Sequence, residues 1–154
     1  MNGKFAKLLY FIVCFIFFLV SDLYVSRILY RSITEGYTYS SKLMAITFVK
    51  NTGAAFNIFP NAREFLIILA VVVLTLLFLY VLKNLKSIWF KEIFFMSILC
   101  AGIAGNLHER ITLGYVRDFF QLKFVNFPVF NISDILINIG VIALIIIILL
   151  KKTK

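Results

Sequence analysis

The sequence predicts a mainly α-helical membrane protein with four transmembrane helices and a small extracytoplasmic β-sheet at the outer membrane surface. The composition is the first reason: 62% of the 154 residues are hydrophobic, whereas a soluble domain is usually about 45–50% apolar. The second is four apolar segments that can cross a bilayer, which takes about 20 residues each. The third is two segments in which apolar and polar residues alternate. A single domain, residues 1–154, is expected.

The four predicted helices follow one another without an internal repeat or a low-complexity linker. They run from about Phe5 to Tyr30, from Phe65 to Leu82, from about Ile93 to Leu107 and from about Ile132 to Leu150. The first carries Asp22, Ser26 and Arg27 in its last third, while the second has no charged residue.

The two predicted strands lie in the loops that separate the first helix from the second and the third from the fourth. Met44–Lys50 alternates roughly, and Phe120–Phe124 alternates cleanly, between apolar and polar or small residues. Period-two alternation predicts short strands and hence a small sheet. Its apolar side would face lipid or a lipid-bearing ligand, or the strands would merely cap the helix bundle. The alternation alone does not distinguish these two arrangements.

Basic residues predict the orientation in the membrane. Eight lie beside the ends of the helices that would share one side: Lys4, Lys7, Lys83, Lys86, Lys91, Lys151, Lys152 and Lys154. Cytoplasmic loops carry an excess of Lys and Arg, so both termini are expected in the cytoplasm and both strand-bearing loops outside. The same rule explains the net charge of +9 without a nucleic-acid partner, because no continuous basic stripe is present.

Several kinds of chemistry have no support in the sequence. Cys14 and Cys100 lie inside apolar runs without metal-binding spacing, so they are interpreted as small core residues. His108 is the sole histidine, and the sequence around it lacks the second histidine of an HExxH zinc site. A zinc site is therefore not expected. Motifs for serine catalysis and for phosphate-binding loops are also absent.

Asp118 and Asp134 bracket one apolar segment that follows the third predicted helix and leads into the fourth. If this segment folds back on itself, both carboxyl groups lie at the outer end of the bundle. Two neighbouring carboxylates cannot both ionise easily, so the pair shares a proton and can act as base and acid. Each residue alone also has a structural interpretation, since Asp134 would stabilise the start of a helix, with Asn131 or Ser133 as N-cap. An ion path is a further alternative to paired catalysis.

Three motifs, read together, resemble those of the lipoprotein signal peptidase (signal peptidase II) family of bacterial membrane aspartyl proteases. They are Asn51–Phe56 (NTGAAF), Gly105–Phe119 (GNLHERITLGYVRDF) and Phe130–Asp134 (FNISD). The resemblance extends from Asp22 to the last helix, in the same order. It implies removal of the signal peptide from a diacylglyceryl-modified prolipoprotein, just before the lipidated cysteine, with no metal or cofactor.

The resemblance also implies roles for individual residues. Asp118 and Asp134 correspond to the catalytic aspartates, and Asn51 and Gly53 to a polar loop that contacts the substrate and supports the site. The remaining supporting residues are Asp22, Asn106, Glu109, Arg110 and Asn131. The family implies an inner-membrane, multi-pass protein with its active site near the extracytoplasmic face and membrane lipid around it. A monomer is expected.

Two positions depart from the family pattern. The family has Asp-x-x-x-Lys on the first helix, but here Ser26 lies four residues after Asp22 and Arg27 lies five after it. Five residues turn a helix by about 140°, so Arg27 would not lie over Asp22. Glu109 replaces the aspartate of Asn-x-x-Asp-Arg. These changes suggest an alternative, a catalytically weak or inactive homologue that binds lipoprotein precursors without turnover. A third hypothesis is a small ion-coupled transporter that uses the membrane-embedded Asp22 and Asp134.

Overall fold

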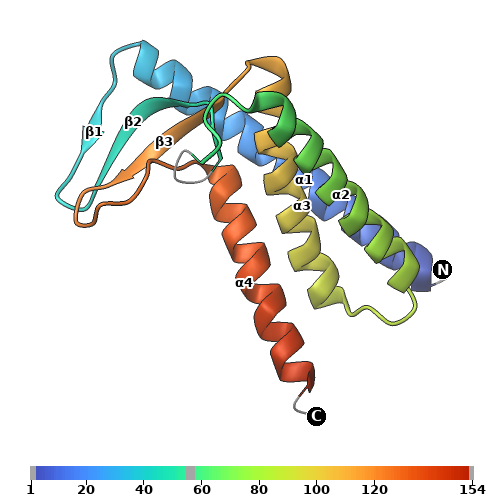
Figure 1. Cartoon of the computed structure of the whole chain (residues 1–154). Coiled ribbons are helices and arrows are strands. Elements are labelled where there is room, and N and C mark those ends of the chain that lie inside the picture. Colours follow the sequence, from blue (N-terminus) through green and yellow to red (C-terminus); the bar gives the residue numbers. More distant parts are fainter. Residues whose placement is uncertain (1–2, 55–57, 153–154) are drawn as a thin grey trace.

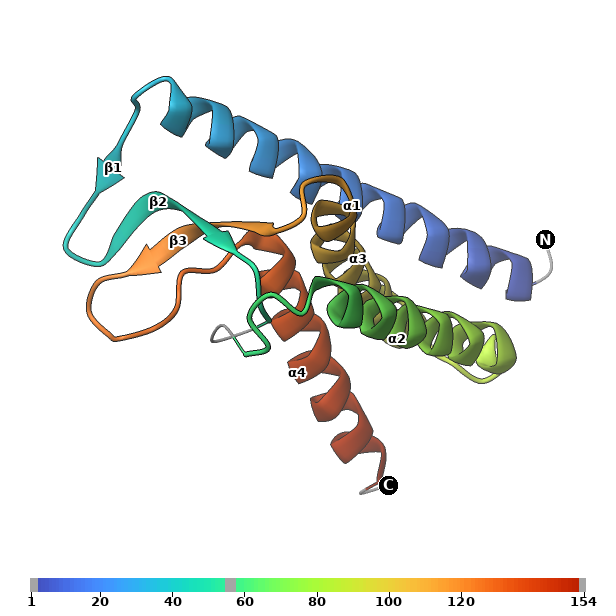
Figure 2. The same cartoon turned by 45° about the horizontal axis from the view of Figure 1, so that its top comes forward.

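The computed structural model describes residues 3–54 and 58–152 of the chain, and over these ranges it confirms the predicted fold class (Figure 1). The elements are α1 (Gly3–Thr34), β1 (Tyr39–Ser40), β2 (Met44–Asn51), α2 (Arg63–Asn84), α3 (Phe90–Thr112), β3 (Val116–Leu122) and α4 (Ile132–Lys152). All four helices are long and apolar enough to span a membrane. The sheet lies at the end of the bundle opposite both described chain ends (Figures 1 and 2).

The helix α3 continues to Thr112 and does not end near Leu107 as the sequence predicted. The apolar run stops at Leu107, but the polar residues that follow remain helical, and the amide of Leu113 still donates to the carbonyl of Glu109 at 2.8 Å. Gly114 then takes φ = 86°, a left-handed conformation that suits glycine and ends helices. Asn106, Glu109 and Arg110 therefore lie on a rigid helix.

The helix α3 is the centre of the bundle and contacts each of the other three helices, whereas α1 and α4 touch each other only slightly. Small residues allow its close approach to α4. A Cβ on Gly102 would come within 2.5 Å of the carbonyl oxygen of Ser133, and one on Gly140 within 2.7 Å of the Leu99 side chain. The two helices that carry the polar residues of the outer end are thus held in direct backbone contact.

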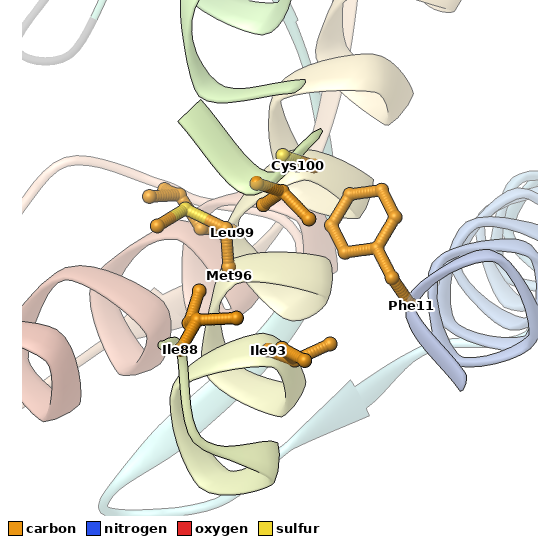
Figure 3. Packing of buried hydrophobic residues seen from close by; sticks show 7 residues of the cluster. Phe11, Ile88, Ile93, Met96, Leu99 and Cys100 are labelled. Carbon is orange, nitrogen blue, oxygen red and sulfur yellow. The ribbon is translucent and has the colours of Figure 1, made fainter. Parts of the chain in front are cut away.

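The apolar core lies toward the middle of the bundle and toward the end at which the chain begins. Phe11 projects from α1 toward Cys100 and Ile93 of α3, with Met96 and Leu99 beside them (Figure 3). Cys100 is buried and Cys14 is half-buried, and both are free thiols, which agrees with their interpretation as small apolar residues.

The sheet has the order β1-β2-β3, with both pairs antiparallel. Strand β3 begins at Val116, earlier than the predicted Phe120, so Asp118 lies within the strand and not before it. The register between β2 and β3 shifts between Ile46 and Val49, which leaves two residues of β2 opposite Phe119 alone. This β-bulge lies immediately beside the Val49–Asp118 pair, and bulges commonly re-aim side chains next to functional sites.

Candidate active site

The segment between β3 and α4 folds back along β3 and brings Asp118 and Asp134 to one place. Phe120 and Phe130 form an antiparallel bridge, with backbone hydrogen bonds of 2.8 and 3.1 Å between them. Because Phe130 is thereby fixed against β3, α4 begins two residues later, directly beside Asp118. The fold-back expected from the sequence is confirmed, and the bridge is what enforces it.

Asn131 is the N-cap of α4. Its side-chain oxygen accepts from the amide of Asp134 at 2.9 Å, and the Asp134 carboxylate accepts in return from the amide of Asn131 at 3.1 Å. This reciprocal arrangement has the geometry of a capping box. It selects Asn131 over Ser133 as the N-cap, and it confirms that Asp134 has a structural role at the helix start.

Asn131 also connects the two aspartates through its amide nitrogen. This nitrogen donates to Asp118 Oδ1 at 2.9 Å and to Asn106 Oδ1 at 3.1 Å. Asn106 in turn donates from its own amide nitrogen to Asp134 Oδ1 at 2.9 Å. These hydrogen bonds fix the orientation of the side-chain amides of Asn106 and Asn131. Both carboxyl groups accept a hydrogen bond from Asn131.

The remaining oxygen of Asp118 is bound from the opposite side by β2. Asn51 donates from its side-chain nitrogen to Asp118 Oδ2 at 2.9 Å, while its side-chain oxygen accepts from the amide of Gly53 at 2.9 Å. All four carboxylate oxygens of the pair thus accept an N–H. Such complete hydrogen bonding permits carboxyl groups to remain in a buried position.

Arg110 holds the loop that follows Asn51 at the end of β2. Its guanidinium donates to the carbonyl of Gly53 at 2.8 Å and to the carbonyl of Asn106, one turn earlier on α3, at 3.3 Å. Arg63 supports this arrangement from α2, since it donates to the carbonyl of Arg110 at 2.9 Å. No motif in the sequence points to Arg63. Of the NTGAAF motif, Ala55 and Phe56 lie outside the described residues.

Glu109 lies beside the pair but is not hydrogen-bonded to it. Its carboxylate accepts from the Arg117 guanidinium at 2.6 and 2.9 Å and from the Arg117 amide at 2.7 Å. The side chains are only 6% and 14% exposed, respectively. Arg117 also lies over the ring of Tyr30 at 5.4 Å. This group therefore fixes the start of β3 to the end of α3 and to α1, a partnership that the sequence did not predict.

Asp22 lies on α1 in contact with the start of α4, where Ser133 donates to its Oδ2 at 2.5 Å. Ser26 is buried and Arg27 is exposed, and no ion pair involves Arg27 among the described residues. As expected from the spacing of five residues along the helix, Arg27 does not pair with Asp22. Ser133 was considered from the sequence only as a helix cap, and its contact with α1 was not anticipated.

Burial and charge set the protonation behaviour of Asp118. Its side chain is removed from water, and this desolvation, reinforced by the nearby charge of Asp134, raises its pKa from 3.8 to about 7. Hydrogen bonds from Asn51 and Asn131 oppose the rise, and the charge of Glu109 adds to it. Asp118 can therefore hold a proton near neutral pH.

A cavity of about 1260 Å³ opens onto the pair and runs between α2 and α4. Asn51, Asn106, Arg110, Asp118 and Asp134 form its polar end. Its walls are apolar and come mainly from the two helices: Leu66, Leu69, Ala70, Val73, Ile135, Ile139 and Ile142. The cavity exceeds the roughly 300–1,000 Å³ of small-molecule pockets. Its shape and polarity suit a ligand with a polar group at one end and a long apolar part.

The described residues hold no group of three or more His, Cys, Asp or Glu side chains that could bind a metal ion. His108 is exposed on α3. The chemistry available at the site is that of two carboxyl groups, their amide partners and the Arg110 guanidinium.

A sequence profile and individual relatives of the chain point to the same family. Residues 11–150 match the sequence profile of the family described as signal peptidase (SPase) II. A lipoprotein signal peptidase of Lactococcus lactis subsp. lactis is 38% identical over 113 residues, which covers 73% of this chain and 74% of the relative. A lipoprotein signal peptidase of Enterococcus faecalis is 34% identical over 122 residues, with coverage of 79% and 74%.

Two solved structures share the fold. One, a bacterial membrane enzyme at 2.3 Å resolution, has a TM-score of 0.78 and 31% identity and covers 94% of this chain and 89% of that one. The other, a bacterial membrane enzyme at 1.9 Å resolution, has a TM-score of 0.76 and 29% identity, with coverage of 90% and 92%.

The Glu109–Arg117 pair gives a stability prediction. Glu109→Ala leaves the largely buried Arg117 guanidinium without its counter-charge, and we expect it to lower the free energy of unfolding by about 3–5 kcal/mol. Removing both partners is expected to recover part of that loss. Reversible unfolding of the purified variants in detergent measures the effect. Equal losses in Glu109→Ala and in the double variant Glu109→Ala/Arg117→Ala would contradict this role.

Proposed function

The chain belongs to the signal peptidase II family, the membrane proteases that process prolipoprotein signal peptides, and from this premise we propose that Asp118 and Asp134 are its catalytic pair. It is a multi-pass bacterial membrane protein. The proposed reaction is hydrolysis of the peptide bond just before the diacylglyceryl-modified cysteine. The observation that carries the proposal is the shared amide network in which Asn131 and Asn106 hold both carboxyl groups beside the cavity.

The surroundings of the two carboxyl groups favour different roles for them. Asp134 lies in the first turn of α4, where the helix dipole favours a negative charge, and it accepts from the Asn131 amide and from Asn106. The positive charge of Arg110 acts on both carboxyl groups, and more strongly on Asp134 than on Asp118. Asp118 lies on a strand, has no cationic hydrogen-bond partner among the described residues, and has a pKa raised to about 7. Asp134 is thus the base and Asp118 the acid.

The reaction then follows the logic of other aspartyl proteases. Asp134 accepts a proton from water while the water oxygen attacks the scissile carbonyl carbon, and Asp118 donates its proton to the carbonyl oxygen. The resulting tetrahedral intermediate collapses as the carbon–nitrogen bond breaks. The proton held by Asp134 passes to the departing amine of the lipidated cysteine, and a hydroxyl proton of the intermediate returns to Asp118. The pair finishes with the single shared proton with which it began.

The cavity supports a lipid-bearing peptide as substrate. Its polar end suits the extended peptide around the scissile bond, while the apolar walls on α2 and α4 suit acyl chains or an apolar signal peptide. Because those walls belong to membrane-spanning helices, such a substrate can remain in the lipid phase as it approaches. We further propose inner-membrane localisation with cytoplasmic termini and an extracytoplasmic site, and a monomer as the active form.

The departures at Ser26 and Glu109 do not favour an inactive homologue. Glu109 keeps three hydrogen bonds from Arg117, and both aspartates keep complete sets of donors. Binding of a precursor without turnover by the unmutated protein would establish that alternative.

Conversion of either aspartate to asparagine tests the catalytic assignment. Asp118→Asn and Asp134→Asn keep the shape of the side chain but remove the exchangeable proton or the base, so each is expected to reduce cleavage by at least about 10³-fold. Release of signal peptide from a purified diacylglyceryl-modified prolipoprotein measures it. Glu64→Gln, at an exposed carboxylate on α2, is the matched control and should cleave normally. Full cleavage by either asparagine variant would refute the assignment.

The raised pKa of Asp118 predicts that cleavage activity and folding stability both depend on pH, for different reasons. Cleavage should fall as pH rises through about 7, because the acid loses its proton. Between pH 3.8 and about 7 the folded protein binds more protons at Asp118 than the unfolded chain, so this residue makes stability decline with rising pH. A kcat/KM profile and unfolding of wild type and Asp118→Asn measure the two effects. An identical pH dependence of stability in the asparagine variant would contradict the raised pKa.

A further inference from the structure

Asp22 is a third buried carboxyl group near the proposed catalytic pair, and the mechanism above does not use it. Its side chain is 2% exposed. Oδ2 accepts from the hydroxyl of Ser133, and Oδ1 is buried without any hydrogen-bond partner among the described residues. Such an orphaned oxygen is unusual, because buried polar atoms are nearly always hydrogen-bonded.

The charges around Asp22 do not favour a carboxylate there. Glu109 of α3 and Asp134 of α4 are close enough to repel a negative charge on it. The cation that acts on it is Arg117 of β3, which is already committed to Glu109 at 2.6 Å. Arg27, the nearest basic residue along α1, is exposed and lies outside the described ion pairs. A buried, unpaired carboxylate is far more costly than a neutral carboxylic acid.

The position of Asp22 connects it to the proposed active site. Ser133 immediately precedes Asp134 in the first turn of α4, and both Ser133 and Asp22 lie against Gly105 of α3. A Cβ on Gly105 would overlap the Asp22 carboxyl group and the Ser133 hydroxyl. The glycine therefore provides the space in which α1 and α4 meet, and the hydrogen bond between Asp22 and Ser133 is a direct link between two helices that otherwise touch little.

We propose that Asp22 is an uncharged carboxylic acid that positions Asp134 through its hydrogen bond with Ser133, so that α1 holds the start of α4 in register with β3. That Asp22 is uncharged follows from its own surroundings. That it positions Asp134 for catalysis rests on the proposed function. Uncharged Asp22 adds no negative charge beside Asp134. The nearby groups Asp134 and Glu109 then retain the charges that act on the proton of Asp118.

Infrared spectroscopy tests the charge state without reference to activity. We expect the difference spectrum between wild type and Asp22→Asn at neutral pH, in lipid nanodiscs, to show loss of one protonated-carboxyl carbonyl band. The matched control, Glu64→Gln, removes an exposed carboxylate and should instead show loss of a carboxylate band. Loss of a carboxylate band in Asp22→Asn would overturn the proposal.

Cleavage kinetics test the positioning role. Asp22→Ala and Ser133→Ala each remove one partner of a buried hydrogen bond, so kcat is expected to fall about tenfold with KM nearly unchanged. Asp22→Asn retains an acceptor for Ser133 and should recover most of this loss with the pH profile of the wild type. The double variant Asp22→Ala/Ser133→Ala should lose no more than either single variant. Additive losses, or equal losses in Asp22→Asn and Asp22→Ala, would overturn the role.

The two experiments separate failure of this inference from failure of the proposed function. If the unmutated protein does not cleave a diacylglyceryl-modified prolipoprotein, the proposed function fails, and the infrared result still decides the charge state of Asp22. If the unmutated protein cleaves while the asparagine and alanine variants behave alike, the positioning role alone is wrong.

Discussion

The site depends most on the side chain of Asn131. Its oxygen caps α4 through the amide of Asp134, while its nitrogen donates to Asp118 and to Asn106. One residue thereby fixes the start of a helix, the separation of two carboxyl groups and the orientation of a second asparagine. Two acids that repel each other would move apart or draw in water in a less constrained place. Here the hydrogen bonds hold them together, and burial and repulsion instead place a proton on one of them.

The rest of the fold serves to keep that network rigid. Helix α3 supplies Asn106, Glu109 and Arg110 from a single rigid surface, since the helix continues beyond its apolar run to Thr112. Strand β2 closes the other side with Asn51, and the bulge beside Val49 adapts the strand to the position of Asp118. Helix α4 supplies both the second aspartate and one wall of the cavity. The apolar helices therefore have two functions: they are solvated by the bilayer, and at one end of the bundle they bring the polar residues of the site together.

Sequence reasoning predicted the features whose signal is local and missed those that depend on contact between distant segments. The four spans follow from hydropathy, and Asp118 and Asp134 from their place in recognisable motifs. The end of α3 was misjudged because polar residues facing a buried site interrupt the apolar pattern without interrupting the helix. Strand β1 has two residues, too few for any periodicity. The pairing of Glu109 with Arg117, and of Asp22 with Ser133, joins residues on different elements, for which a single sequence holds no signal.

The central claim is that the two carboxyl groups activate water directly, one as base and one as acid. A single turnover with excess enzyme in ¹⁸O-labelled water, followed by mass spectrometry of the signal peptide and of the enzyme, tests this most directly. Direct activation of water predicts one ¹⁸O atom in the new carboxyl terminus of the signal peptide and none in Asp118 or Asp134. Label in either aspartate would instead show that a carboxylate attacks the substrate covalently.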